Sequence, residues 1–211
     1  MLEALAQFPI GFVVALSGAL IPGPMLAFVI MKTFSYGART GPFAVAGHIL
    51  VELAILVLIA LGLGFLLQSQ PSQIVVGVVG GALLVAIGLL NLMKVRTKVT
   101  KPKVAGLKPH PLLGGVLFST ILNPTVPLWW ATVGLVMLTE AVLVASLAGA
   151  VFWLLGHWLA DLTWFSFISY SVARGKQLIG TRGYKALLIT CGCVLLIFGA
   201  YFIFKFALSA L

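Results

Sequence analysis

The sequence has 211 residues, of which 62% are hydrophobic and only 8% are charged. Soluble domains carry about 25% charged residues, so this composition excludes an ordinary soluble domain and predicts a membrane protein. The net charge of +9 would suit a nucleic-acid-binding protein, but the basic residues lie between long apolar segments, where they are a topology signal. We therefore expect no nucleic-acid partner.

Six apolar segments follow one another along the chain, at residues 8–31, 42–67, 73–93, 112–138, 141–171 and 185–208. A helix needs about 20 apolar residues to cross a bilayer, and short alternating segments typical of a membrane β-barrel are not seen in the sequence. The sequence predicts an all-α integral membrane protein with six transmembrane helices. Its expected parts are a three-helix unit at 1–93, a basic linker at 94–111 and a second three-helix unit at 112–211.

The basic residues predict the orientation of these helices. Of the 13 lysines and arginines, 12 fall on one side of the predicted membrane, and Lys205 is the exception. Because loops rich in Lys and Arg stay inside the cell, the 94–111 linker is expected in the cytoplasm and both termini outside. The expected location is the plasma membrane.

The two halves of the chain share three motifs in the same order, which predicts an internal repeat. The matched segments are Ile21-Pro22-Gly23-Pro24 with Leu122-Asn123-Pro124-Thr125, Gly47-His48-x-x-x-Glu52 with Gly156-His157-x-x-x-Asp161, and Gly81-x6-Gly88 with Gly192-x6-Gly199. Since each unit has three spans, the second must enter the membrane from the opposite face, as in the 3+3 inverted repeats of many transporters. The alternative is an old duplication that serves only packing.

Prolines in the first and fourth spans predict breaks in these helices. Pro22, Pro24 and Pro124 cannot donate the backbone hydrogen bond that a continuous helix requires. A break would leave a helix N-terminus inside the membrane, near Gly23-Pro24 and near Asn123-Pro124-Thr125, where free amides suit a carboxylate. The alternative is a simple proline kink.

Two buried His–acid pairs are the other candidate site. His48 and Glu52 are four residues apart, as are His157 and Asp161, so each pair shares a helix face, and Trp164 lies near the second pair. Acids inside a membrane span are costly and usually functional, which predicts a cation, ammonium or proton site. Two alternatives remain: purely local hydrogen bonds, and a divalent metal site for zinc or manganese.

Several of these motifs resemble the LysE/RhtB family of amino-acid exporters. The resemblance rests on Pro22-Gly23-Pro24, on Lys32 with the segment 35–41, on Gly47, on the glycines of 61–64, and on Gly114-Gly115 followed by Asn123-Pro124. It covers nearly the whole chain. It implies export of amino acids or related metabolites driven by the proton motive force, and the wider superfamily includes metal-ion exporters.

The sequence and the resemblance together predict a secondary transporter that exports an amino acid or a similar small zwitterionic metabolite with proton coupling. The alternative function is a divalent metal-ion exporter. A membrane enzyme is not expected, because no nucleophile–base set, redox cysteine pair or dense metal cluster is evident in the sequence. We expect no cofactor and no resident metal, a lipid bilayer as surroundings, and an oligomeric state that the sequence leaves open, a homodimer included.

Overall fold

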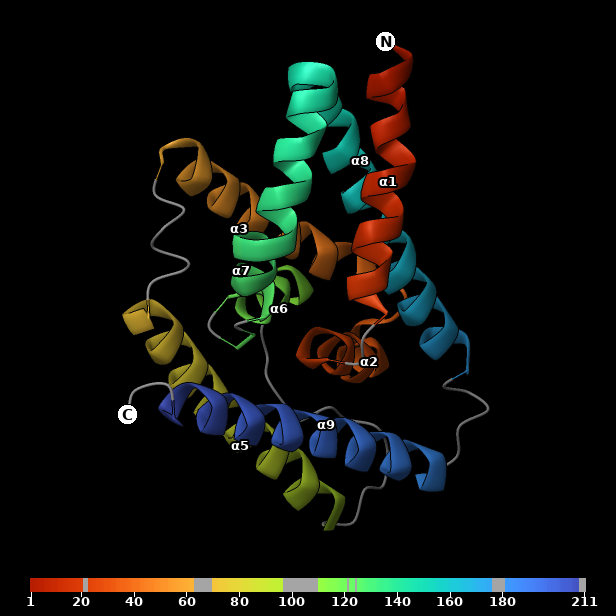
Figure 1. Ribbon diagram of the computed structural model, residues 1–211. Helices are drawn as coiled ribbons and strands as arrows, with labels where there is room; N and C mark the ends of the chain where they lie inside the picture. Colours follow the sequence, from red (N-terminus) through yellow and green to blue (C-terminus); the bar gives the residue numbers. More distant parts are fainter. Residues whose placement is uncertain are drawn as a thin grey trace.

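A computed structural model describes residues 1–20, 23–62, 70–96, 110–120, 122–123, 125–175 and 181–208. Every regular element in these ranges is a helix (Figure 1). The helices are α1 (Leu2–Ala19), α2 (Pro24–Tyr36), α3 (Thr40–Ala60), α5 (Gln70–Arg96), α6 (Pro111–Leu117), α7 (Thr125–Trp129), a π-helical turn η1 (Trp130–Gly134), α8 (Leu135–Gly175) and α9 (Thr181–Leu208). Pro22, Pro124 and most of the predicted 94–111 linker lie outside the described residues.

Several of these helices are long and apolar enough to cross a bilayer. Four segments meet this criterion among the described residues: Leu2–Ala19, Thr40–Ala60, Leu135–Gly175 and Leu188–Phe206, and α5 contains the shorter apolar stretch Gly77–Leu90. Many large apolar side chains on them are exposed, including Val57, Leu147 and Phe204. Such a surface is stable against lipid, so the chain is a multi-pass helical membrane protein.

The predicted first span is two helices rather than one. The helix α1 ends at Ala19, and α2 begins at Pro24 after an extended Gly23 with φ −146° and ψ −176°. Proline is favoured at the first position of a helix, because the amide that it lacks would have no partner there. Figure 1 shows α2 running across the lower end of α1, so this segment has the break that its prolines predicted.

The fourth and fifth spans differ from their predicted bounds. The predicted segment 112–138 contains α6, α7, η1 and the beginning of α8. The chain reverses within α8 at Ala145 and Ser146, where Ser146 has φ 54° and ψ −153°, so the predicted boundary at residues 139–140 is wrong. The polar Thr139 and Glu140 suggested a turn, but they are exposed on a helix that continues past them.

Helices α1 and α8 run side by side (Figure 1) and approach closely at two glycines. A Cβ atom on Gly11 would overlap the carbonyl oxygen of Trp153, and one on Gly156 would overlap the carbonyl oxygen of Phe8. Small residues allow such contact between helix backbones in membranes. This contact fixes the orientation of α8 at Gly156. It therefore also fixes the direction of the next residue, His157.

The contact between α3 and α6 has the same form. A Cβ atom on Gly47 would overlap the carbonyl oxygen of Leu112, and one on Gly115 would overlap that of Ala44. Gly47 precedes His48, as Gly156 precedes His157. The two crossings therefore hold the two predicted His–acid pairs at corresponding places.

Helices α5 and α9 form a separate pair, with α2 between this pair and the remaining helices (Figure 1). They meet through reciprocal glycine contacts: a Cβ atom on Gly81 would lie 2.7 Å from the carbonyl oxygen of Gly199, and the reverse distance is also 2.7 Å. A Cβ atom on Gly88 would likewise lie 2.9 Å from the carbonyl oxygen of Gly192. The pair supports α2, whose residues Met25 and Phe28 share a core cluster with Leu195 and Phe202 of α9.

Alanine at Gly11 should destabilise the protein, whereas alanine at Gly18 of the same helix should not. The first methyl group would overlap the backbone of Trp153, and overpacking of this kind costs about 1–3 kcal/mol. At Gly18 the nearest atom is Trp129 Nε1 at 3.7 Å, so alanine fits there and favours the helix by up to about 1 kcal/mol. Thermal unfolding in detergent compares the variants, and equal losses would contradict the close crossing.

Candidate functional site

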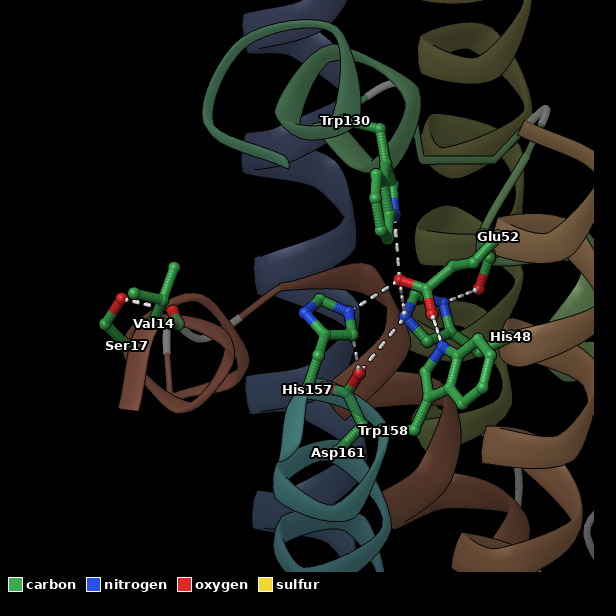
Figure 2. Close-up of polar contacts among 9 residues, drawn as sticks. Val14, Ser17, His48, Glu52, Trp130, His157, Trp158 and Asp161 are labelled. Atoms are coloured by element: carbon green, nitrogen blue, oxygen red, sulfur yellow. Dashed lines mark hydrogen bonds and ion pairs between the residues drawn. The ribbon is translucent and has the colours of Figure 1, made fainter. Parts of the chain in front are cut away.

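The structure brings the two predicted His–acid pairs together where α3 faces α8. His48 and Glu52 come from α3, and His157 and Asp161 come from α8. All four are buried, with exposed fractions of 8%, 1%, 4% and 5% respectively. Figure 2 shows the four side chains pointing toward one another from the two helices.

The four residues form one cluster rather than two local pairs. Glu52 Oε1 lies 3.1 Å from His48 Nε2 on its own helix and 2.9 Å from His157 Nε2 on α8. Asp161 Oδ2 lies 3.5 Å from Nε2 of each histidine. The alternative of independent i,i+4 hydrogen bonds does not describe this arrangement, because Glu52 is bonded across the helix interface.

Two tryptophans complete the surroundings of Glu52. Trp130 Nε1 donates to Glu52 Oε1 and Trp158 Nε1 donates to Oε2, both at 2.9 Å. Figure 2 shows the two indoles reaching the carboxylate from different elements, η1 and α8. An indole can only donate, so both Glu52 oxygens keep a donor whatever the protonation of the histidines.

Asp161 has a different environment from Glu52. Its Oδ2 atom is buried and has no hydrogen-bond donor among the described residues, since both imidazoles lie beyond the usual hydrogen-bond distance. The other ring nitrogen of His48, Nδ1, lies 2.7 Å from Ser119 Oγ, which orients that ring. The two carboxylates at corresponding positions of the two motifs are therefore unequal in the structure.

Aromatic rings surround His157. The rings of Trp129, Trp130 and Trp153 lie 5.1, 5.4 and 5.4 Å from the imidazole, centroid to centroid. Nδ1 of His157 is buried and has no partner among the described residues. The ring therefore has little room to move away from Glu52.

A cavity of about 210 Å³ opens beside the cluster. All four cluster residues line it, together with Ala15, Gly18, Ala19, Gly23, Pro24, Met25, Leu26, Asn123, Thr125, Val126, Trp129, Phe165 and Phe198. The break between α1 and α2 is thus part of its wall. The cavity is thus lined by the polar groups of the cluster, by the helix ends and by apolar side chains.

The two helix ends in the cavity wall differ in their capping. At the start of α2, Gly23 has no side chain to accept from the amides of Met25 and Leu26. At the start of α7, the side chain of Asn123 accepts from the amide and the hydroxyl of Thr125. Of the two ends, α2 is the one without a side-chain cap.

Most predicted site residues in the described ranges lie at this cavity, and Trp164 does not. It stacks on Phe167 with 6.1 Å between ring centroids and packs against the hydrophobic core. The sequence prediction also missed Ser119, Trp129, Trp130 and Trp158. One signal was present: the five tryptophans are all located between residues 129 and 164, around the second His–acid pair.

The cluster also has the composition of a metal site. One ligand atom from each of His48, Glu52, His157 and Asp161 can be chosen so that all four lie within 4.8 Å of one another. Two imidazoles and two carboxylates suit zinc or manganese. Within the described part of the chain, these four residues could hold a divalent ion.

An ionisable cluster beside a cavity, inside a multi-pass helical membrane protein, is typical of a membrane transporter. The family model of the LysE type translocator matches residues 16–205. The chain therefore belongs to the LysE type translocator family, and the resemblance noted in its motifs is confirmed. Searches among curated proteins and among solved structures returned no significant match.

Proposed function

We propose that the protein is a secondary transporter that exports an amino acid or a similar small zwitterionic metabolite in exchange for protons. The observation that carries this proposal is the pairing of unlike groups at one cavity: buried carboxylates on α3 and α8, and the uncapped start of α2. A zwitterion carries the complementary charges. Its ammonium group would bind at the carboxylates, and its carboxylate at the amides of Met25 and Leu26.

The size of the cavity supports a small substrate. Its volume of about 210 Å³ lies below the roughly 300–1,000 Å³ of pockets for drug-sized ligands. A single amino acid suits such a space better than a large metabolite does.

The charges at the cavity support proton coupling. The ionisable side chains among the described residues that line it are His48, Glu52, His157 and Asp161. An unbalanced carboxylate in a membrane interior is costly, so Asp161 needs a positive partner. Either a protonated His48 or the ammonium group of the substrate can be this positive partner. If the two alternate beside Asp161, one proton is exchanged for one substrate molecule.

The helix contacts support a 3+3 inverted repeat as the framework of this mechanism. In both the α1–α8 and the α3–α6 crossings, the glycine before a cluster histidine meets the backbone of the partner helix, and that helix returns the contact through a glycine. The α5–α9 contacts of Gly81 with Gly199 and of Gly88 with Gly192 exchange under the same repeat. Such a repeat would allow the cavity to open alternately to the two sides.

The orientation proposed here places the basic connections in the cytoplasm and both termini outside the plasma membrane. The sorting of 12 of the 13 basic residues to one side supports it. A thiol reagent that cannot cross the membrane tests it at a cysteine placed in the 94–111 linker. Rapid labelling of that cysteine in intact cells would contradict the orientation.

A divalent metal-ion exporter is the second candidate. The four clustered ligand atoms favour it. The hydrogen bonds to Glu52 weigh against it, because Trp130 and Trp158 each donate to one of its carboxylate oxygens. An indole N–H does not lose its proton near neutral pH, so these two donors stay next to any metal ion bound there.

Vesicles containing the purified protein test the proposal. They are loaded with a mixture of unlabelled amino acids and diluted into acidic buffer, and the efflux of each is measured by mass spectrometry. We expect at least one amino acid to leave faster than from protein-free vesicles, and an ionophore that collapses the pH gradient should remove the difference. Efflux of Zn²⁺ or Mn²⁺ without efflux of any amino acid would establish the second candidate instead.

A further inference from the structure

We infer that the two carboxylates have unequal roles, and that their inequality selects neutral amino acids with apolar side chains as substrates. Asp161 takes the ammonium group of the substrate, and Glu52 is a fixed anion that holds the two halves of the site together. The inference rests on the proposed function, because it concerns the same cavity.

Glu52 has little capacity left for a ligand. Its two oxygens accept from Trp130, Trp158 and His157 at 2.9 Å each, and His48 Nε2 lies 3.1 Å away. The donors come from η1 and α8, so the carboxylate joins these elements to α3. Oε2 accepts only from Trp158, but with an exposed fraction of 1% Glu52 leaves an ammonium group little access to the remaining lone pair.

Asp161 has the opposite character. It lines the cavity with an exposed fraction of 5%, and its Oδ2 atom has no hydrogen-bond donor among the described residues. A buried carboxylate without donors is costly, and an ammonium group supplies up to three. The structure therefore leaves one carboxylate, on α8, available for the positive end of a substrate.

The uncapped end of α2 faces the same cavity as Asp161. Gly23, Pro24, Met25 and Leu26 all line it, and the two last residues have amides without a side-chain cap. The carboxylate of Asp161 and the uncapped helix N-terminus match one ammonium and one carboxylate group. An α-amino acid presents this pair on a single carbon atom.

The other residues that line the cavity determine which substrate side chain fits. They are mostly apolar, with Met25, Leu26, Val126, Trp129, Phe165 and Phe198, and the polar Asn123 and Thr125 are hydrogen-bonded to each other. No lysine or arginine is among the described residues that line the cavity, so an acidic side chain would have to compete with Glu52 and Asp161 for the imidazoles of the cluster. A basic side chain would need a second accessible carboxylate, and Glu52 is 1% exposed and already accepts from Trp130, Trp158 and His157.

Binding measurements with the full-length protein in lipid nanodiscs test this inference. The probes are L-leucine, 4-methylpentanoate, which is leucine without its amino group, L-lysine and L-glutamate. Binding is followed by tryptophan fluorescence, because Trp129 lines the cavity. We expect leucine to bind about tenfold or more tighter than each of the other three, since a buried charge-assisted hydrogen bond contributes about 1.5–3 kcal/mol.

Two variants separate the carboxylates. Asp161→Asn should weaken leucine binding about tenfold or more and leave 4-methylpentanoate binding nearly unchanged, with a melting temperature that is not lowered. Glu52→Gln should lower the melting temperature, because the glutamine amide must turn its NH₂ group toward an indole or imidazole donor. A Glu52→Gln variant that does not fold agrees with the fixed role of this residue.

The results that would overturn the inference are distinct from failure of the proposed function. Equal binding of leucine by wild type and Asp161→Asn would remove the role of Asp161, and tighter binding of lysine or glutamate would remove the selectivity. If Asp161→Asn does not fold, the wild-type comparison of leucine with 4-methylpentanoate decides alone, and equal affinities overturn the inference. Efflux of charged amino acids only would refute the inference and keep the proposed function, whereas efflux of no amino acid would refute the proposed function.

Discussion

Glutamine in place of His48 should abolish proton-driven accumulation of the substrate while leaving its exchange across the membrane intact. His48 Nε2 lies between the two carboxylates, 3.1 Å from Glu52 and 3.5 Å from Asp161, and Nδ1 lies 2.7 Å from Ser119 Oγ. Among the described residues of the cluster, the only other imidazole is that of His157. Glutamine retains hydrogen-bonding capacity, but it cannot carry a proton near neutral pH as a histidine can.

The size of the expected effect follows from the exchange of one proton for one substrate. A difference of one pH unit is worth about 1.4 kcal/mol and supports roughly a tenfold concentration ratio. In vesicles with an imposed pH gradient, the His48→Gln variant should show a ratio of about one. Counterflow of labelled against unlabelled amino acid should continue, because Asp161 is retained.

Ser119→Ala is the matched control for His48→Gln. It removes the partner of His48 Nδ1 and keeps the imidazole. We expect slower transport with coupling preserved, since the group that carries the proton is still present. Full proton-driven accumulation by the His48→Gln variant would contradict the coupling role of His48.

Phenylalanine at Trp130 should cost far more stability than phenylalanine at Trp153. Both tryptophans are completely buried, and their rings lie 6.1 Å apart. Trp130 Nε1 donates to Glu52, whereas Trp153 Nε1 has no partner among the described residues. The loss of ring volume is the same in both variants, so the difference reports the hydrogen bond.

A hydrogen bond to a buried charged group contributes about 1.5–3 kcal/mol, and this is the expected difference in the free energy of unfolding between the two variants. Thermal and denaturant unfolding in detergent micelles would measure it. In a Glu52→Gln background the difference should shrink, because the acceptor no longer carries a charge. Equal losses for the two phenylalanine variants would show that Glu52 does not depend on Trp130.

The same donors explain why the two carboxylates could not be ranked from the sequence. Glu52 and Asp161 occupy equivalent positions in the two motifs, so the sequence predicts equivalent roles. Trp130 is 78 residues from Glu52 and Trp158 is 106 residues away, and these hydrogen bonds exist only because η1 and α8 pack against α3. Sequence spacing carries no information about which of two carboxylates receives donors from distant helices.

Features that depend on local covalent chemistry were accessible from the sequence. The helical membrane class follows from apolar segments of bilayer length, the break before Pro24 from the missing amide of proline, and the shared face of each His–acid pair from helical periodicity. The motif around Pro22-Gly23-Pro24 also indicated the family that the match over residues 16–205 establishes.

Features that depend on packing were decided only by the tertiary structure. The turn at Ala145 and Ser146 lacks a glycine or proline signal, and Trp164 lies one helical turn from Asp161 but packs into the core. The convergence of two His–acid pairs into one cluster requires α3 and α8 to meet, which Gly47 and Gly156 permit through contacts with other helices. Periodicity determines which face of a helix carries a residue, and only the packing of all helices determines what that face meets.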